Sequence, residues 1–169
     1  MRHSKAATHA PRPDLTAADV METKIVTVSR TAPLSEVERL LTEHRISGMP
    51  VVDVAEHAIG VISYRDLLEH YDEEAETRPR HAPDYYRIAA EELREEDVDV
   101  DFAVPEESED TAEDAMSRDV IHVRSDTRLN EVAETMVERN VHRVLVTDPE
   151  SEKVVGIISS LGLLAALVR

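Results

Sequence analysis

An internal repeat constrains this chain more than any other feature of its sequence. Shifting the sequence by 95 residues places residues 16–70 on residues 111–167, with one extra residue in a turn of the second copy. A unit of roughly 55 residues buries too small a fraction of its surface to be secure alone. The sequence therefore predicts two copies of one unit, packed together about a pseudo-twofold axis. Identical matched residues include Thr16 and Thr111, Asp19 and Asp114, Met21 and Met116, Leu34 and Leu129, Val51 and Val146, Gly60 and Gly156, and Ser63 and Ser159.

Each copy has the same order of predicted elements. A short apolar strand is expected at 25–28 and again at 120–123, followed by a helix, two strands and a closing helix. Pro33 suits the first turn of one helix, and Asp126 or Thr127 is a candidate cap for the other. The prediction is an α/β (α+β) fold of two tandem β-α-β-β-α repeats. The faces expected to be buried are Leu34, Val37, Leu40 and Leu41 in the first copy, and Leu129, Val132, Ala133 and Met136 in the second.

The segment between the copies differs from them in character. Residues 72–110 hold sixteen acids and four arginines, a net charge of −12 out of −17 for the whole chain. Apolar residues at 86–93 have helical spacing, which predicts a short amphipathic helix there. A solvated linker is the favoured interpretation, and a partner-docking element is the alternative. Including a disordered N-terminal arm, the predicted division is 1–14, 15–71, 72–110 and 111–169.

Composition excludes several classes of function. The net charge of −17 argues against nucleic acid and anionic membranes as partners. The absence of cysteine excludes disulfides, thiolate catalysis and cysteine zinc sites. No apolar run is long enough to span a bilayer and no secretory signal is evident, so we expect a cytoplasmic protein. We expect neither catalysis nor a metal site, because no nucleophile has a base nearby in sequence and the histidines lack the spacing of a helical zinc motif. The histidines considered were His44, His57, His70 and His81.

Two pairs of matched segments carry a resemblance to a known family. GVISYRDL at 60–67 matches GIISSLGL at 156–163, and RISGMPVVD at 45–53 matches NVHRVLVTD at 140–148. In their order, spacing and repetition they resemble a tandem pair of CBS (cystathionine β-synthase) domains, a Bateman module. The resemblance implies a stand-alone regulatory module that binds an adenosine ligand between the repeats and signals to a partner protein or to its own oligomer. The ligands implied are AMP, ADP, ATP or S-adenosylmethionine, and a flat homodimer is implied as well.

The second repeat is similar in particular to the gamma subunit of AMP-activated kinase, and this similarity implies site residues. Asp66 and Ser63 would come from the first copy, with the acid on the ribose. His142 and Arg143 would come from the second copy and face the phosphate. The residue types agree, because a carboxylate can accept two bonds from a cis-diol and a guanidinium fits a phosphate. Backbone groups near Ile121 and Val123 would border the adenine.

The mirror-related cleft lacks these groups, and alternatives remain open for the first cleft. Gly162 stands where Asp66 would be matched, and Ser47-Gly48 stands where the His-Arg pair would be. One nucleotide site per chain is therefore expected. Asp66 as a mere helix cap and Arg143 as the partner of a surface acid are the alternatives for those residues. A ligand-free interaction scaffold acting through the acidic linker is the second hypothesis for function. The apolar closing helix favours contact with another protomer.

Overall fold

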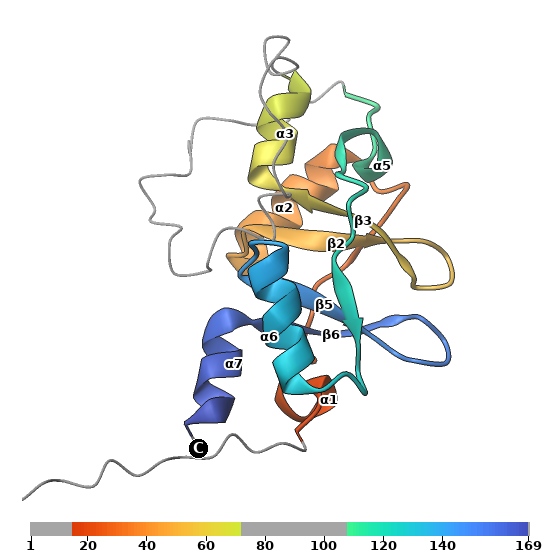
Figure 1. Ribbon diagram of the computed structural model, residues 1–169. Helices are drawn as coiled ribbons and strands as arrows, with labels where there is room; N and C mark the ends of the chain where they lie inside the picture. Colours follow the sequence, from red (N-terminus) through yellow and green to blue (C-terminus); the bar gives the residue numbers. More distant parts are fainter. Residues whose placement is uncertain (1–14, 72–107, 169) are drawn as a thin grey trace, which may run out of the picture.

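The two repeats have the same succession of elements in the computed structural model, which describes residues 15–71 and 108–168 (Figure 1). The predicted order is confirmed, with one short helix added at the start of each copy. The predicted linker helix at 86–93 lies outside the described residues. The first copy contains α1 (Ala17–Val20), β1 (Val28–Ser29), α2 (Leu34–His44), β2 (Gly48–Val52), β3 (Ala58–Ser63) and α3 (Tyr64–Tyr71). The second contains α5 (Ala112–Ala115), β4 (His122–Arg124), α6 (Leu129–Glu138), β5 (Arg143–Thr147), β6 (Val154–Ser159) and α7 (Ser160–Leu167).

Each copy forms a three-stranded sheet with the same register. The strand orders are β1-β2-β3 and β4-β5-β6, with the first pair of each sheet parallel and the second antiparallel. Val51 faces Gly60 in one sheet, Val146 faces Gly156 in the other, and a register shift follows both pairs. The sheets therefore support the predicted pseudo-twofold relation.

The first strand of each copy differs from the prediction. Of 25–28, only Val28 joins the sheet, and the strand of the second copy begins two residues later than expected, at His122. Before β1, Glu22 pairs with Ile157 of the other repeat and not with a strand of its own sheet. The strand predicted at 25–28 is therefore wrong for 25–27, and the bridge to the other repeat, at Glu22, lies outside the apolar run.

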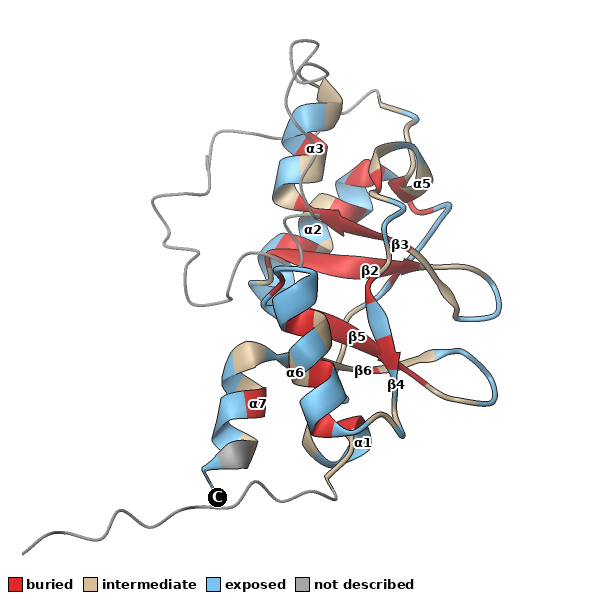
Figure 2. Ribbon diagram, viewed as in Figure 1, coloured by how far each residue is buried: buried red, intermediate tan, exposed pale blue. Residues whose placement is uncertain are grey.

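The long helices α2 and α6 bury the faces predicted from their periodicity. Leu34, Val37 and Leu41 are buried in α2, and the matched residues of α6 are buried in the same way (Figure 2). Pro33 is the N-cap of α2. The cap predicted for α6 is wrong, because the N-cap is Arg128 and the two candidates serve the preceding turn instead. There Thr127 Oγ1 accepts a bond from the Arg124 backbone N–H at 3.1 Å, and Asp126 pairs with the Arg124 guanidinium at 2.8 Å.

Each repeat lends its first helix to the other repeat. The Ala17 N–H donates to the Thr127 carbonyl at 2.8 Å, and Ala17 is fully buried in the core built around the second sheet. In the mirror arrangement, the Ala112 N–H donates to the Ala32 carbonyl at 2.8 Å, and Ala112 lies in the core of the first sheet. Figure 1 shows α1 beside α6 and α5 beside α3. Neither core is complete without residues from the other half of the chain.

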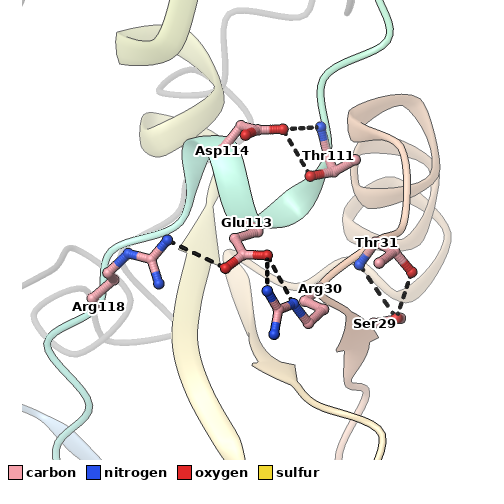
Figure 3. A network of polar contacts seen from close by, with 7 residues as sticks. All are labelled: Ser29, Arg30, Thr31, Thr111, Glu113, Asp114 and Arg118. Atoms are coloured by element: carbon pink, nitrogen blue, oxygen red, sulfur yellow. Dashed lines mark hydrogen bonds and ion pairs between the residues drawn. The ribbon is translucent and has the colours of Figure 1, made fainter.

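Side-chain contacts fasten α5 to the first repeat. The Arg30 guanidinium pairs with the Glu113 carboxylate at 2.6 Å, and Arg118 approaches the other oxygen of that carboxylate at 3.4 Å (Figure 3). Both arginines are largely exposed, so this pairing contributes little stability compared with the buried contacts of the helix. The pairing instead fixes the position of α5 against the turn after β1.

Matched capping boxes begin α1 and α5, the helices that each pack in the core of the other repeat. Thr16 donates its backbone N–H and its hydroxyl to the Asp19 carboxylate at 2.8 and 2.9 Å. Thr111 donates in the same way to Asp114 at 2.8 and 2.7 Å (Figure 3). In both carboxyls, the backbone hydrogen bond is the larger cause that lowers the pKa below the ordinary 3.8.

These lowered pKa values predict acid sensitivity. A depressed pKa in the folded state gives stability that is present above pH 3.8 and lost as the pH falls through the folded value. We therefore expect the melting temperature to fall on acidification from about pH 5 to about pH 2. The double variant Asp19→Asn with Asp114→Asn should melt lower at neutral pH and show a shallower fall. Thermal melts monitored by circular dichroism across this range test it, and an equal slope in both proteins would contradict it.

Candidate functional site

Three buried polar residues lie where the two repeats meet. Among the described residues, the buried polar or charged side chains are Ser47, Ser63, Arg143 and Thr147, and Thr147 lies apart from the others at the far end of β5. Ser47 immediately precedes β2, Ser63 ends the neighbouring strand β3, and Arg143 begins β5. The residue after Ser47 is the register partner of Ser63. Since buried polar groups need hydrogen-bond partners, such a cluster marks either a structural network or a binding site.

The acid of the first repeat belongs to a capping box at the start of α3. Ser63 donates its backbone N–H and its hydroxyl to Asp66 Oδ2 at 2.7 and 2.5 Å. The Asp66 N–H approaches the Ser63 hydroxyl oxygen at 3.4 Å. Asp66 therefore does cap its helix, as one of the alternatives expected. Both bonds fall on one carboxylate oxygen, Oδ2. The capping role of Asp66 is thus observed, and its contact with a ligand stays a prediction.

The matched position in the second repeat keeps the cap but not the charge. The Ser159 hydroxyl accepts a bond from the Gly162 N–H at 3.1 Å, so it caps α7 as Ser63 caps α3. Ser159 is exposed, whereas Ser63 is buried. The two ends of the pseudo-symmetric structure therefore differ in chemistry although their backbones match.

Arg143 connects the two repeats. Its Nη1 donates to the Ser47 hydroxyl oxygen at 3.4 Å, across the junction between the sheets. Within its own sheet, Arg143 of β5 pairs with Ser159, the last residue of β6. The cation of the second repeat thus lies against the strand end of the first repeat, and that strand pairs with the one leading into Asp66.

The remaining predicted residues lie in or beside β4 and β5 and differ in exposure. The His142 side chain is exposed, and its carbonyl accepts a bond from the Ser160 N–H at 2.8 Å. Ile121 and Val123 are buried, and their carbonyls accept from the Leu145 N–H at 3.1 Å and from Thr147 Oγ1 at 3.4 Å. Their assignment to an adenine stays a prediction.

Ser47 is the residue that sequence reasoning passed over. In the sequence, it marked only the position where a second cation is missing. In the structure, its hydroxyl oxygen accepts a hydrogen bond from the Arg143 guanidinium of the other repeat. The available signal was its match to His142 under the 95-residue shift. That match places the two residues at equivalent strand ends, which face each other across a pseudo-twofold axis.

The histidines that lie among acids have local partners. His70 Nε2 lies 3.2 Å from Asp110 Oδ2, and His57 lies between the Asp53 carboxylate and the Ser151 carbonyl. His81 lies outside the described residues. Within 15–71 and 108–168, no group of three or more histidine, aspartate or glutamate side chains is arranged to hold a metal ion. In those same ranges, no helix has the length and apolar character needed to cross a bilayer.

Sequence comparisons match both copies. The family described as "CBS domain" matches residues 17–73 and 112–169. Uncharacterized protein MJ1426 of Methanocaldococcus jannaschii is 30% identical over 159 residues, which cover 89% of this chain and 89% of that protein. Uncharacterized protein MJ1232 of the same organism is 28% identical over 152 residues, or 90% of this chain, and the chain spans 39% of its length.

Three solved structures of similar fold are between 21% and 24% identical to this chain, so they show the fold alone. CBSX2 in complex with AMP has a TM-score of 0.62 at 22% identity, covering 90% of this chain and 96% of that one. The CBS domain pair of protein MJ0100 with 5′-methylthioadenosine and S-adenosyl-L-methionine scores 0.60 at 21%, covering 90% and 95%. The cytosolic domain of the Mg²⁺ channel MgtE with ATP scores 0.61 at 24%, covering 90% and 48%.

Proposed function

Because the chain belongs to the CBS-domain family, with two such domains in tandem, we propose that it is a regulatory module binding an adenine nucleotide between its repeats. The observation that carries the proposal is the buried polar cluster that joins the strand end leading to Asp66 with Arg143 of the other repeat. Similar folds in complexes with AMP, with ATP, and with methylthioadenosine and S-adenosylmethionine support the class of ligand.

The proposed roles follow from the chemistry of each group. Asp66 accepts hydrogen bonds from the two ribose hydroxyls, and Ser63 holds that carboxylate in place. Arg143 and His142 face the phosphate, where a planar guanidinium offers paired donors. The remaining backbone groups, near Ile121 and Val123, border the adenine in an apolar setting.

Direct binding measurements test the proposal. Isothermal titration with AMP, ADP, ATP and S-adenosylmethionine should reveal a ligand with a dissociation constant below about 1 mM, or roughly −4 kcal/mol. One site per chain is expected, because Gly162 and Ser47-Gly48 supply neither acid nor cation to the mirror-related cleft. The same ligand should raise the melting temperature. Failure of all four compounds to bind in this range would overturn the proposed function.

Binding regulates only to the extent that the ligand distinguishes two conformations. A ligand shifts a conformational equilibrium by no more than its difference in affinity for the two states. Each of α1 and α5 completes the core of the opposite repeat. A ligand that changes how the repeats pack would therefore affect both cores. We propose that this coupling passes the signal to a partner protein or to the oligomer, without catalysis by the module itself.

The outward face of α7 supports a homodimer. Leu161 and Leu164 of α7 and Val168, its C-cap, are 56%, 57% and 79% exposed, at a spacing that puts them on one side of the helix. The matched helix α3 has the charged Arg65 in place of Leu161, while Leu68, in place of Leu164, is less exposed at 37%. A stripe of large apolar side chains is costly to leave in water, so we propose that α7 packs against a second copy of the chain.

Charge placed on this stripe should separate the protomers. The double variant Leu161→Glu with Leu164→Glu is expected to halve the mass seen by light scattering, because like charges then meet at the contact. Val137→Glu is the matched control, since Val137 is exposed and apolar but lies on α6. A wild-type protein that is strictly monomeric at working concentration would contradict the proposal.

The scaffold hypothesis depends on a different part of the chain. It assigns partner binding to 72–110, of which the structure describes only 108–110. Those three residues belong to the fold, since the Asp110 carbonyl accepts a bond from the Leu34 N–H at 3.0 Å. No observation on the described residues favours this second function.

A further inference from the structure

We infer that Ser47 is a positioning residue, which directs the guanidinium of Arg143 toward the phosphate of the bound nucleotide. The inference deepens the proposed function and rests on it. It concerns a residue of the first repeat that has no charge and no place among the groups implied by the family resemblance. Its side chain contacts the cation, and through that cation it acts on the ligand.

Burial makes the contact between these two residues matter. Ser47 is 7% exposed and Arg143 is 9% exposed. A buried guanidinium is costly unless its N–H groups are hydrogen-bonded, and its geometry is set by the acceptors that surround it. The Ser47 hydroxyl oxygen is such an acceptor, 3.4 Å from Nη1. Removing this acceptor therefore changes where one arm of the guanidinium is held.

The backbone of Ser47 is tied to the acid's side of the site. The Tyr64 N–H donates to the Ser47 carbonyl at 3.3 Å, and Tyr64 is the first residue of α3. That helix carries Asp66 in its first turn. A single residue thus contacts both the helix of the proposed ribose-binding acid and the proposed phosphate-binding cation. Ser47 thus links the two charged residues of the proposed site.

The pseudo-twofold relation explains why a small residue is required. Under the 95-residue shift, Ser47 and Gly48 occupy the positions of His142 and Arg143. The large cationic pair of one repeat therefore faces the small pair of the other. A second His-Arg pair would place two guanidinium groups at the same junction, where like charges repel in a poorly hydrated setting. The small pair leaves the junction to one cation.

A double-mutant cycle tests the inference. The ligands are adenosine and whichever of AMP, ADP and ATP binds the wild-type protein most tightly. Ser47→Ala should lower nucleotide affinity about tenfold, the size expected for a hydrogen bond to a charged group, and change adenosine affinity less than twofold. In an Arg143→Ala background, Ser47→Ala should have no further effect on the nucleotide. Ser159→Ala is the matched control, since Ser159 is the register partner of Arg143 but its hydroxyl serves Gly162.

The outcomes separate this inference from the function on which it rests. Equal losses for nucleotide and adenosine in Ser47→Ala, or additive losses in the cycle, would overturn the positioning role alone. Tightest binding of S-adenosylmethionine would also overturn it, because that ligand has no phosphate, and would leave the adenosine site intact. No binding of any adenine compound by the wild-type protein would overturn the proposed function and this inference together.

Discussion

Replacing Asp66 by alanine is expected to abolish most of the nucleotide affinity. A carboxylate that accepts two ribose hydroxyls makes two charge-assisted bonds, so its loss should cost about 2–4 kcal/mol, or roughly 30- to 1000-fold in the dissociation constant. The variant should bind one ligand per chain only at much higher concentration. Isothermal titration of wild type and variant measures the difference.

Asp66 also caps α3, so the experiment needs a control for lost stability. Asp114→Ala removes the acid of a matched capping box in α5, where Thr111 donates to it much as Ser63 donates to Asp66. Both variants should melt at a lower temperature than the wild type, because each loses the acid of a capping box. Only Asp66→Ala should lose affinity.

The pair of variants decides between the two roles of Asp66. If Asp66→Ala and Asp114→Ala melt at similar temperatures and both retain wild-type affinity, Asp66 is a structural cap only. In that case the ribose must be held by other groups, and the site as proposed is wrong. If affinity falls in Asp66→Ala alone, capping and binding are both established for one carboxylate.

Local pattern was sufficient for the longer helices and for the antiparallel strand pairs of this fold. Apolar spacing predicted the buried face of α2, and the repeated glycine-aliphatic segments predicted β3 and β6. The crossing of α1 and α5 was not predictable in this way, since the pattern of a short segment says that it is buried but not which core buries it. The sequence showed that Met21 matches Met116 and that Gly60 matches Gly156. It did not show that Met116 lies on Gly60 and Met21 on Gly156, because these residues are far apart in the chain.

In the candidate site, too, the local contact was predictable from the sequence and the long-range contact was not. Ser63 and Asp66 lie three residues apart at a helix start, so their contact follows from local geometry. Arg143 and Ser47 are 96 residues apart, and their contact depends on how two sheets meet. The resemblance to a family named the cation but not the uncharged residue that receives it.

The second large effect is expected at a glycine of the repeated segment. A Cβ built at Gly60 would meet the Met116 sulfur and would lie 2.8 Å from the Ser117 carbonyl oxygen. That carbonyl accepts the Val61 N–H at 2.9 Å, in the bridge that holds the crossing segment to β3. Gly60→Ala therefore must displace backbone, and we expect it to lower the free energy of unfolding by about 2–3 kcal/mol. The midpoint of urea unfolding measures this loss.

Two other glycines provide graded controls. The atoms nearest to a Cβ at Gly156 all belong to the flexible Met21 side chain, with the sulfur at 2.6 Å, so Gly156→Ala should cost less, about 1 kcal/mol. A Cβ at Gly162 would meet only the Ser159 hydroxyl, at 3.4 Å. Since alanine is the better helix former, Gly162→Ala should gain up to about 1 kcal/mol.

A rescue experiment distinguishes backbone displacement from side-chain crowding. Met21→Ala should recover part of the stability lost in Gly156→Ala, because it removes the sulfur and Cγ that crowd the new methyl group. Met116→Ala should recover less in Gly60→Ala, because the Ser117 carbonyl stays in place. Equal recovery in both pairs would show that the crossing segment moves freely over β3. The two cores would then be less tightly coupled than a signal passing between the repeats requires.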